Sequence, residues 1–380
     1  MKSEIAFSNP HAATQASSRG RLREMAPDPY RTEYQRDIHR IIYSQAFRRL
    51  RHKTQVFFLP NNDHICTRIE HSLHVASASR TVARQLGLNE DLAEAIGLGH
   101  DLGHAPFGHH GEDVLNKLAQ ESGLEITFQH EMHGLRVVDK LAELDREPKS
   151  GLNLTYEVRD GIISHCGEDF SREIKRESNY KALEHISTRA EALTPCTLEG
   201  CIVRVVDKIA YAGRDTEDAL VAGLIKETDI PREVIDVLGS NNGEIIGTLL
   251  SDLIDYCTSN SDKVGLSEDK YSALDKLIKF NYAKIYRHEN VEKFKKQATH
   301  AIKELFVRLV EDLNKTQRLT TSVDKLPEAS IYSVLKKFIE KIDYMENEPN
   351  ELIVLDFIAG MTDNYVVHCL DEIFVPKAIC

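Results

Sequence analysis

The side chains most able to do chemistry in this sequence begin with the adjacent pair His100-Asp101. The pair lies in a segment with four glycines and a proline, Gly97-Leu98-Gly99-His100-Asp101-Leu102-Gly103-His104-Ala105-Pro106-Phe107-Gly108-His109. Neighbouring side chains reach one point only where the backbone is unusual, and glycine permits such a backbone. Ten of the 17 histidines also lie between His64 and His165. Because imidazole and carboxylate are common ligands of divalent transition metals, this clustering predicts a metal site.

Two further segments offer side chains of the same kind. His71 lies in residues 68–75, whose apolar spacing predicts a helix, and Asp207 lies in a second predicted helix at about 199–220. His71 alone is typical of an ordinary, partly buried imidazole. Joined with His100, Asp101 and Asp207, however, it completes a set of two imidazoles and two carboxylates.

That set suits a cation of intermediate hardness with open water positions, such as Mn²⁺, Fe²⁺ or Ni²⁺. Mg²⁺ is a less natural choice, because it prefers oxygen ligands. No cysteine lies beside these residues in the sequence, which argues against a structural zinc site. The sequence therefore predicts a divalent metal cofactor and leaves its identity open.

Helices must position these groups. Asn89-Glu90-Asp91 reads as an N-cap followed by acids, and it opens a helix that runs into the His100-Asp101 pair. In the helix at about 199–220 the apolar residues recur at helical spacing and should face the core, namely Ile202, Val205, Val206, Ile209 and Ala212.

On the same helix Asp207, Tyr211 and Asp215 follow at i, i+4 and i+8 and form one polar stripe. A solvated helix face is the plain alternative for this stripe.

The rest of the chain also predicts an all-α fold. Residues 221–380 read as amphipathic helices broken by polar linkers, without sustained strand alternation. Residues 1–26 are polar and predict a loose N-terminal arm. We expect residues 27–380 to form a single domain, with a catalytic core at about 30–220 and a helical C-terminal extension at about 221–380.

Composition restricts the function classes. The formal net charge is −12, which argues against extended, non-specific nucleic-acid binding. The seven cysteines are scattered and odd in number, which is typical of reduced thiols in a cytoplasmic protein. No apolar stretch approaches the roughly 18 residues of a membrane span, so we expect no membrane contact.

The motifs, in order, resemble the HD-domain deoxynucleoside triphosphate triphosphohydrolases, the dGTPase-like enzymes. The likeness extends over about residues 29–290. A bare His-Asp pair is a weak signal, since the wider HD superfamily hydrolyses many phosphate esters; the extended set is far more specific. It comprises residues 47–56, 67–73, 100–109, 128–131, 152–157, 207–211 with Asp215, and 286–288.

The resemblance implies a role for each matching position. Metal ligands would be His71, His100, Asp101 and Asp207. The catalytic group around the α-phosphate would be His104, His109, His130 and Glu131, with Glu131 orienting His130. The substrate-binding group would be Gln55, Val56, Arg68, Lys208, Tyr211 and Asp215. Arg68 would contact the phosphates, Lys208 and Tyr211 the polyphosphate tail, and Gln55, Val56 and Asp215 the deoxyribose.

The implied reaction is metal-dependent hydrolysis of a deoxynucleoside triphosphate (dNTP) to deoxynucleoside and inorganic triphosphate, by attack of metal-activated water at the α-phosphate. Relatives assemble as homo-oligomers, commonly hexamers. Some are activated by a dNTP and some bind single-stranded DNA, so both stay open as partners.

Two other functions remain as alternatives. One is another HD phosphohydrolase, acting on a nucleoside monophosphate, a cyclic nucleotide or a guanosine polyphosphate. The other is a nucleotide-sensing or single-stranded-DNA-binding module on the same fold. The full metal-ligand set argues against the module, because a sensor does not need it. A zinc-protease motif fails on spacing, since His130 and His133 are three residues apart and HExxH needs four.

Two features stay ambiguous at the sequence level. The run Arg48-Arg49-Leu50-Arg51 fits a nucleotide-binding or regulatory patch as well as a solvated helix face. His165 is interpreted as the end of a packed helix.

Overall fold

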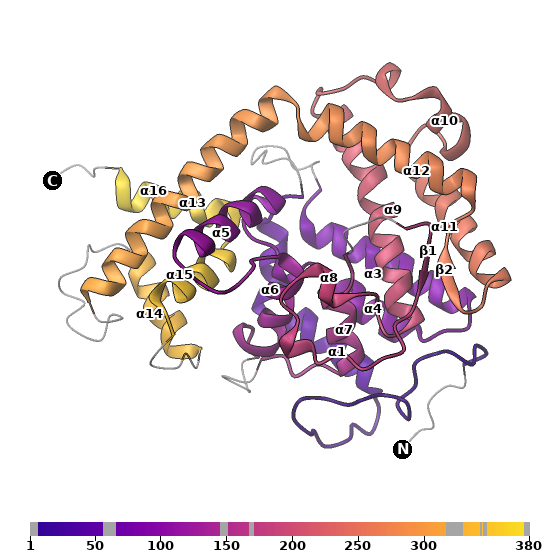
Figure 1. Cartoon of the computed structure of the whole chain (residues 1–380), viewed down its shortest axis with the longest axis horizontal. Coiled ribbons are helices and arrows are strands. Elements are labelled where there is room, and N and C mark those ends of the chain that lie inside the picture. Colours follow the sequence, from indigo (N-terminus) through magenta and orange to yellow (C-terminus); the bar gives the residue numbers. More distant parts are fainter. Residues whose placement is uncertain are drawn as a thin grey trace.

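The computed structural model describes residues 7–55, 66–144, 151–166, 171–316, 330–342, 344 and 348–375. Across these residues the chain forms sixteen α-helices and one two-stranded antiparallel sheet, which confirms the all-α prediction (Figure 1). The helices are α1 (Glu33–Tyr43), α2 (Gln45–Arg49), α3 (Arg68–Gln85), α4 (Glu90–Gly99), α5 (Gly108–Glu121), α6 (His130–Arg136), α7 (Tyr156–Ile163), α8 (Arg189–Ala192), α9 (Leu198–Val221), α10 (Arg232–Leu238), α11 (Asn242–Ser259), α12 (Glu268–Asn281), α13 (Glu289–Lys315), α14 (Ser330–Lys341), α15 (Asn350–Ala359) and α16 (Asp363–Phe374). The strands are β1 (Glu173–Lys175) and β2 (Lys263–Gly265).

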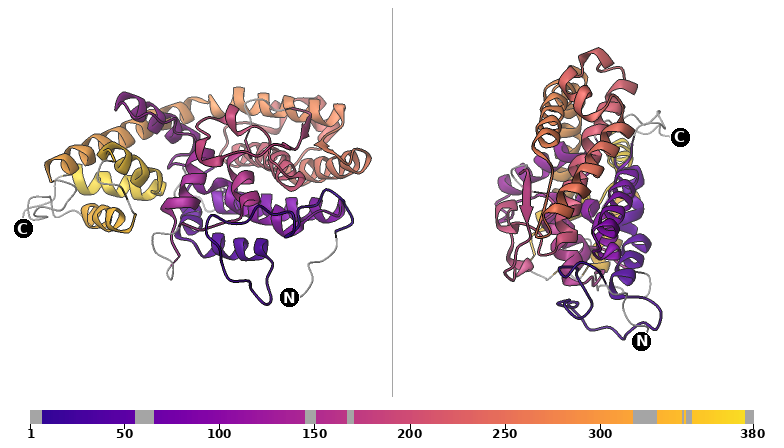
Figure 2. Two further views of the ribbon diagram at one scale, coloured as in Figure 1. Left: turned by 60° about the horizontal axis from the view of Figure 1, so that its bottom comes forward. Right: turned by 90° about the vertical axis from the view of Figure 1, so that its right-hand side faces the viewer.

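Apolar side chains gather in two hydrophobic clusters. The larger cluster joins α1, α3, α4, α7 and α9 to α10, α11 and α12. The smaller cluster joins α5 to α13, α14, α15 and α16. The long helix α13 starts beside α12 and runs to the group of α14, α15 and α16, which lies at one end of the molecule (Figures 1 and 2). The C-terminal extension therefore contributes to both clusters.

Helix α9 is central to the larger cluster and packs against α3, α4, α7, α11 and α12. Thr197 caps it, because its side chain accepts a hydrogen bond from the backbone N–H of Gly200. All five apolar residues predicted to face the core are buried. Asp207 and Asp215 of the polar stripe are buried as well, so the stripe faces inward and is not a solvated face.

Helix α4 delivers the His-Asp pair as the sequence predicts. The Asn89 side chain accepts a hydrogen bond from the backbone N–H of Leu92, and this caps α4. At its other end α4 passes into a 3₁₀ turn over His100–Gly103. The glycines allow neighbouring backbones to come close. A Cβ on Gly97 would lie 2.7 Å from the Cα of Ala76 in α3, and one on Gly103 would lie 2.0 Å from the carbonyl oxygen of His130.

The described part of the predicted N-terminal arm, residues 7–26, makes polar contacts with the helices. The backbone N–H of Ala13 donates to Glu199 at 3.0 Å. Arg21 forms ion pairs with Glu33 and with the fully buried Asp37. Buried polar partners thus tie this polar segment to α1 and α9. Among the described helices, none is long and apolar enough to cross a membrane.

Candidate metal centre and active site

Three elements far apart in sequence bring the predicted metal ligands together. Helix α3 carries His71, the 3₁₀ turn after α4 carries His100 and Asp101, and α9 carries Asp207. All four side chains are buried. His71 Nε2 lies 2.9 Å from Asp207 Oδ1. His100 Nε2 lies 3.3 Å from His71 Nε2 and 3.6 Å from Asp207 Oδ1. His71, His100 and Asp207, named here the Asp207 group, thus direct three donor atoms at one point.

The imidazole of His100 is oriented for metal binding. Its Nδ1–H donates to the carbonyl oxygen of Gly97 at 2.7 Å, one helical turn earlier. That bond fixes the tautomer and leaves the lone pair of Nε2 directed at His71 and Asp207. Burial lowers the pKa of His100 to about 4, so the ring is neutral at physiological pH. A neutral imidazole opposite a carboxylate fits a divalent cation.

Asp101 lies at the edge of the Asp207 group. Its Oδ1 is 3.4 Å from His100 Nε2 and 3.0 Å from His104 Nε2, and its Oδ2 is 3.1 Å from Arg68 Nη1. Burial opposes ionisation of this carboxyl, but His104, His100 and Arg68 together hold its pKa well below the usual range. Asp101 is therefore a carboxylate shared between the candidate metal ligands and two neighbouring cationic or hydrogen-bonding groups.

Arg68 is among the most buried large side chains of the described chain, with 1% of its surface exposed. Its Nε and Nη2 atoms have no hydrogen-bond partner among the described residues, while Nη1 pairs with Asp101. A buried guanidinium nitrogen without a partner is costly, and a forked guanidinium matches the oxygens of a phosphate. Arg68 therefore fits the predicted phosphate contact.

A second group of titratable side chains lies beside the first. It consists of His104, His109, Glu112 and His130 and is named here the His130 group. The rings of His104 and His130 stack with their centroids 3.8 Å apart. His130 Nδ1 donates to Glu112 Oε2 at 2.7 Å. His109 is the open member of the group, since 69% of its side chain is exposed.

The orientation of His130 differs from the expectation. The resemblance implies that Glu131 orients the ring, but His130 Nδ1 donates its hydrogen bond to Glu112. Glu131 Oε2 lies 3.5 Å from that atom, and Glu131 Oε1 accepts from Arg189 at 2.5 Å. Arg189 also donates to Glu112 at 2.9 Å and so bridges the two carboxylates. Burial opposes protonation of His130, but the charges of Glu131 and Glu112 raise its pKa to about 10.

Sequence reasoning missed Glu112 and Arg189. Glu112 follows His109 by three residues on α5, which is one helical turn, and this spacing is a usable signal. Arg189 starts the short helix α8 and lies 59 positions from His130, so no local pattern connects it with the site.

His165 also has a different place from the one expected. It follows the C-terminus of α7 as predicted, yet its Nε2 lies 3.3 Å from His130 Nε2. Its Nδ1–H donates to the carbonyl oxygen of Ile162 at 2.6 Å, which repeats the arrangement at His100. The His100 and His165 ring centroids are 5.1 Å apart. His165 therefore connects the Asp207 group with the His130 group.

The predicted sugar and polyphosphate contacts lie along α9 and beside Arg68. Asp215 is buried and accepts a hydrogen bond from the hydroxyl of Tyr286, in the 286–288 motif. Burial raises the pKa of Asp215 to about 7. Lys208 and Tyr211 are half-buried on the same helix, and burial raises the pKa of Tyr211. Gln55 is half-buried, and its Oε1 has no partner within the described ranges. Val56 lies outside the described residues.

Comparisons with known proteins agree with this arrangement. A model of the HD domain matches residues 68–212, and a model of the phosphohydrolase-associated domain matches residues 264–372. A deoxyguanosinetriphosphate triphosphohydrolase-like protein of Caldanaerobacter subterraneus subsp. tengcongensis is 40% identical over 374 residues, which cover 98% of this chain and 94% of the relative. This chain belongs to the deoxyguanosinetriphosphate triphosphohydrolase-like family of HD-domain phosphohydrolases.

Other members of this dGTPase-like family are also similar along nearly their whole length. The relative in Desulfatibacillum aliphaticivorans is 37% identical, with 98% of this chain and 96% of the relative covered. The relative in Clostridium tetani is 34% identical, with 97% and 93% covered. The family likeness inferred from the motifs is thereby confirmed, and the chain is a hydrolase of the metal-dependent HD class with candidate metal-binding groups at its centre.

Proposed function

We propose that this protein hydrolyses deoxynucleoside triphosphates to deoxynucleoside and inorganic triphosphate. The observation that carries the proposal is the convergence of His71, His100 and Asp207 from three separate elements, next to the stacked pair His104 and His130. The relatives from Caldanaerobacter and Desulfatibacillum are deoxyguanosinetriphosphate triphosphohydrolase-like proteins, which supports this reaction over other phosphate-ester hydrolyses.

The metal ligands in this proposal are His71, His100, Asp101 and Asp207. A divalent cation bound there, whether Mn²⁺, Mg²⁺, Fe²⁺ or Ni²⁺, supplies a Lewis acid for a phosphoryl oxygen and lowers the pKa of water. The residues fit such a cation, because both imidazoles present Nε2 and the carboxylates are ionised: burial opposes ionisation, but His71 and His100 lower the pKa of Asp207.

The triphosphate and the sugar are held by groups around these ligands. Arg68 binds phosphate oxygens through the nitrogens that Asp101 does not occupy. Lys208 and Tyr211 contact the polyphosphate tail. Gln55, Val56 and Asp215 contact the deoxyribose, with Asp215 held by Tyr286. Because Asp215 has a pKa of about 7, it can either donate to or accept from the 3′-hydroxyl near neutral pH.

Protons are handled by the His130 group. The oxygen of water bonds to the α-phosphorus, the bond from that phosphorus to O5′ breaks, and all three phosphates leave together as triphosphate. The deoxynucleoside takes up one proton at O5′. His130 is held as an imidazolium by Glu131 and Glu112 and is the proposed proton donor. His104 Nε2 faces Asp101, and its Nδ1 has no partner within the described chain, so Nδ1 can accept a hydrogen bond from the attacking water. His109, at the open side, contacts the phosphate.

Product analysis tests the proposal. The four dNTPs are supplied singly and mixed, with Mn²⁺ or Mg²⁺, in water enriched in ¹⁸O, and the products are separated and weighed by mass spectrometry. We expect inorganic triphosphate carrying one ¹⁸O and unlabelled deoxynucleoside. Pyrophosphate with a monophosphate would contradict the proposal. His71→Ala should abolish turnover, whereas His300→Ala, which alters a histidine with 78% of its side chain exposed, is the matched control and should leave it unchanged.

Three further expectations belong to the same proposal. Activity that needs a mixture of dNTPs would establish a dNTP activator. Binding to single-stranded DNA is tested by fluorescence anisotropy of a labelled oligonucleotide. Assembly into a homo-oligomer, with a hexamer as the expectation, is tested by mass photometry. The cysteines that the structure describes are unpaired, which fits a cytoplasmic, reducing location.

A further inference from the structure

A cavity of about 480 Å³ lies apart from the candidate active site. It is lined by residues of α2, α6, α14, α15, α16 and the segments beside them, and none of the proposed catalytic, metal or substrate residues lines it. One wall, with Val137 and Ala142, belongs to the larger hydrophobic cluster, and the opposite wall, with Phe357 and Met361, belongs to the smaller one. The cavity therefore lies where the two clusters meet. Its volume is in the range of small-molecule sites, roughly 300–1,000 Å³.

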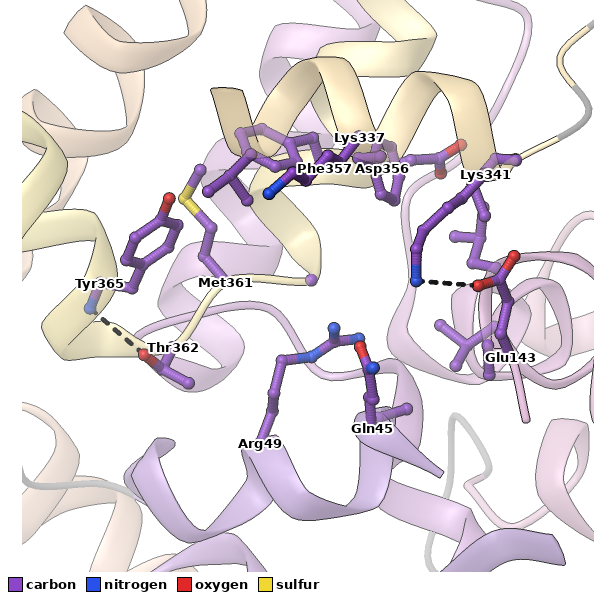
Figure 3. A pocket seen from close by; sticks show the side chains of 18 of the residues that line it. Gln45, Arg49, Glu143, Lys337, Lys341, Asp356, Phe357, Met361, Thr362 and Tyr365 are labelled. Atoms are coloured by element: carbon purple, nitrogen blue, oxygen red, sulfur yellow. Dashed lines mark hydrogen bonds and ion pairs between the residues drawn. The ribbon is translucent and has the colours of Figure 1, made fainter. Parts of the chain in front are cut away.

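The two acidic side chains in the lining already have cationic partners. Asp356 accepts from Arg136 at 2.6 and 2.8 Å and from the Tyr344 hydroxyl at 3.0 Å. Glu143 pairs with Lys341 at 3.2 Å, as the dashed line in Figure 3 marks. Neither carboxylate is left to neutralise a further cation.

Two cations in the lining have no such partner. Arg49 and Gln45 reach into the space from α2, opposite the wall that carries Lys337 and Phe357 (Figure 3). Neither Arg49 nor Lys337 forms an ion pair or hydrogen bond with another described residue. Arg49 is half-buried, and burial lowers its pKa with no carboxylate acting against it. A guanidinium in such a place favours an anion, because no carboxylate among the described residues compensates for its desolvation.

The remaining lining is mostly apolar and partly aromatic. Phe338 and Phe357 lie with their ring centroids 5.4 Å apart, and Val334 and Met361 extend this surface. His133 lines the cavity too, and its Nε2 is buried without a hydrogen-bond partner among described residues. Burial keeps the His133 ring neutral by holding its pKa well below the usual range. Such walls suit a ring or another flat apolar group, with the charge of the ligand at Arg49 and Lys337.

We propose that this cavity is a second ligand site, which binds a small organic phosphate with the phosphate between Arg49 and Lys337 and an apolar ring against Phe338 and Phe357. The proposal goes beyond the proposed function and does not depend on it. Of the basic run Arg48-Arg49-Leu50-Arg51, Arg49 lines the cavity, while its neighbour Arg48 is exposed.

The test separates the two halves of the ligand. Binding of phenyl phosphate, inorganic phosphate and phenol is measured by isothermal titration calorimetry on the full chain in EDTA, so that a metal-dependent site does not contribute. Phenyl phosphate should bind at least about tenfold more tightly than inorganic phosphate or phenol. Binding of adenosine monophosphate and deoxyadenosine monophosphate is measured in the same way, to test whether the natural ligand is a nucleotide.

Arg49→Met and Lys337→Met should each weaken phenyl phosphate binding by about tenfold or more, since each removes one charge from the pair. Arg48→Met is the matched control from the same helix and should change the affinity less than about twofold. Arg49→Lys keeps the charge but not the fork and should be intermediate. The melting temperature of Arg49→Met should equal or exceed that of the unmodified protein, because the removed cation has no partner among the described residues. A lower melting temperature would assign Arg49 a structural role and overturn the proposal.

A crystal soaked with 4-bromophenyl phosphate locates the ligand directly. We expect a bromine anomalous peak beside Phe338 and Phe357. A peak only near Arg68, no peak, or affinities of Arg49→Met and Lys337→Met equal to that of Arg48→Met would overturn the proposal.

Discussion

The Asp207 group and the His130 group are close neighbours, and one histidine of each, His100 in the first and His130 in the second, shows how its partners change an imidazole. In the first, His100 donates its Nδ1–H to a main-chain carbonyl, and burial lowers its pKa to about 4. In the second, His130 donates its Nδ1–H to Glu112, and despite burial its pKa rises to about 10. A neutral acceptor leaves a ring suited to bind a metal, whereas a carboxylate acceptor creates an imidazolium suited to give a proton. For these two rings, the charges of Glu131 and Glu112 beside His130, together with the acceptor of Nδ1, separate the two roles.

The largest effect should follow a change in the Asp207 group. Asp207→Asn keeps the shape of the side chain but removes the charge that faces His71 and His100. We expect turnover of dNTPs to fall by about a thousandfold or more, because a bound metal lowers the barrier by several kcal/mol. Metal content after gel filtration, measured by inductively coupled plasma mass spectrometry, should fall with it. Turnover retained at a tenth or more of the original would show that Asp207 is not a metal ligand.

A substitution in the His130 group should have a smaller effect on turnover and should alter proton transfer rather than metal binding. Glu112→Gln removes the carboxylate bonded to His130, so kcat should fall by about a hundredfold, within the usual range for general acid–base groups, while metal content stays unchanged. Because a raised pKa holds the proton until the pH passes that value, the loss of Glu112 should move the alkaline limb of the pH profile of kcat to lower pH. Glu131→Gln should shift this limb in the same direction but less, because Glu131 contributes its charge alone, whereas Glu112 contributes both a charge and a hydrogen bond to the ring. Equal shifts in both variants would argue against the assignment of Glu112.

Metal stabilisation should also distinguish the two groups. A ligand that binds only the folded state adds about 2.7 kcal/mol at a hundredfold excess over its Kd. Mn²⁺ should therefore raise the melting temperature of the EDTA-treated protein by several degrees. The rise should vanish in His100→Ala and persist in His130→Gln, as measured by differential scanning fluorimetry. If Mn²⁺ failed to raise the melting temperature of His130→Gln but still raised that of His100→Ala, the metal would bind at the His130 group and not at the Asp207 group.

The smallest effect concerns Asp215, a buried acid whose bonded partner is a hydroxyl and not a cation. Its folded-state pKa of about 7 lies above the ordinary value of about 3.9. The folded state therefore holds this proton more tightly, and the contribution of Asp215 to stability declines as the pH rises from about 4 to about 7. Asp215→Asn should remove this decline, so that its free energy of unfolding relative to the unmodified protein improves with pH across that window in urea titrations. A difference that is constant with pH would show that Asp215 is ionised throughout.

Residue spacing within one segment was enough to predict the helices and the side chains that share one face of a helix. The i, i+4, i+8 stripe on α9 and the capped α4 that ends at the His-Asp pair both follow from local periodicity. The confirmed all-α class likewise follows from local patterns.

The site residues that sequence reasoning missed depend on contacts between elements. Glu131 is the sequence neighbour of His130, yet the ring donates to Glu112, which lies 18 positions earlier on α5. The contacts of Arg189 and His165, and the walls of the cavity at Arg49, bring together segments that are far apart in the sequence. No local residue spacing predicts such contacts.

The most direct test of the account is anomalous diffraction at the manganese edge from a crystal grown with Mn²⁺. Both groups could hold an ion by the spacing of their donor atoms, so the position of the peak decides between them. We predict a peak bounded by the Nε2 atoms of His71 and His100 and by the carboxylates of Asp101 and Asp207. A peak between His104, Glu112 and His130, without one beside Asp207, would contradict the account.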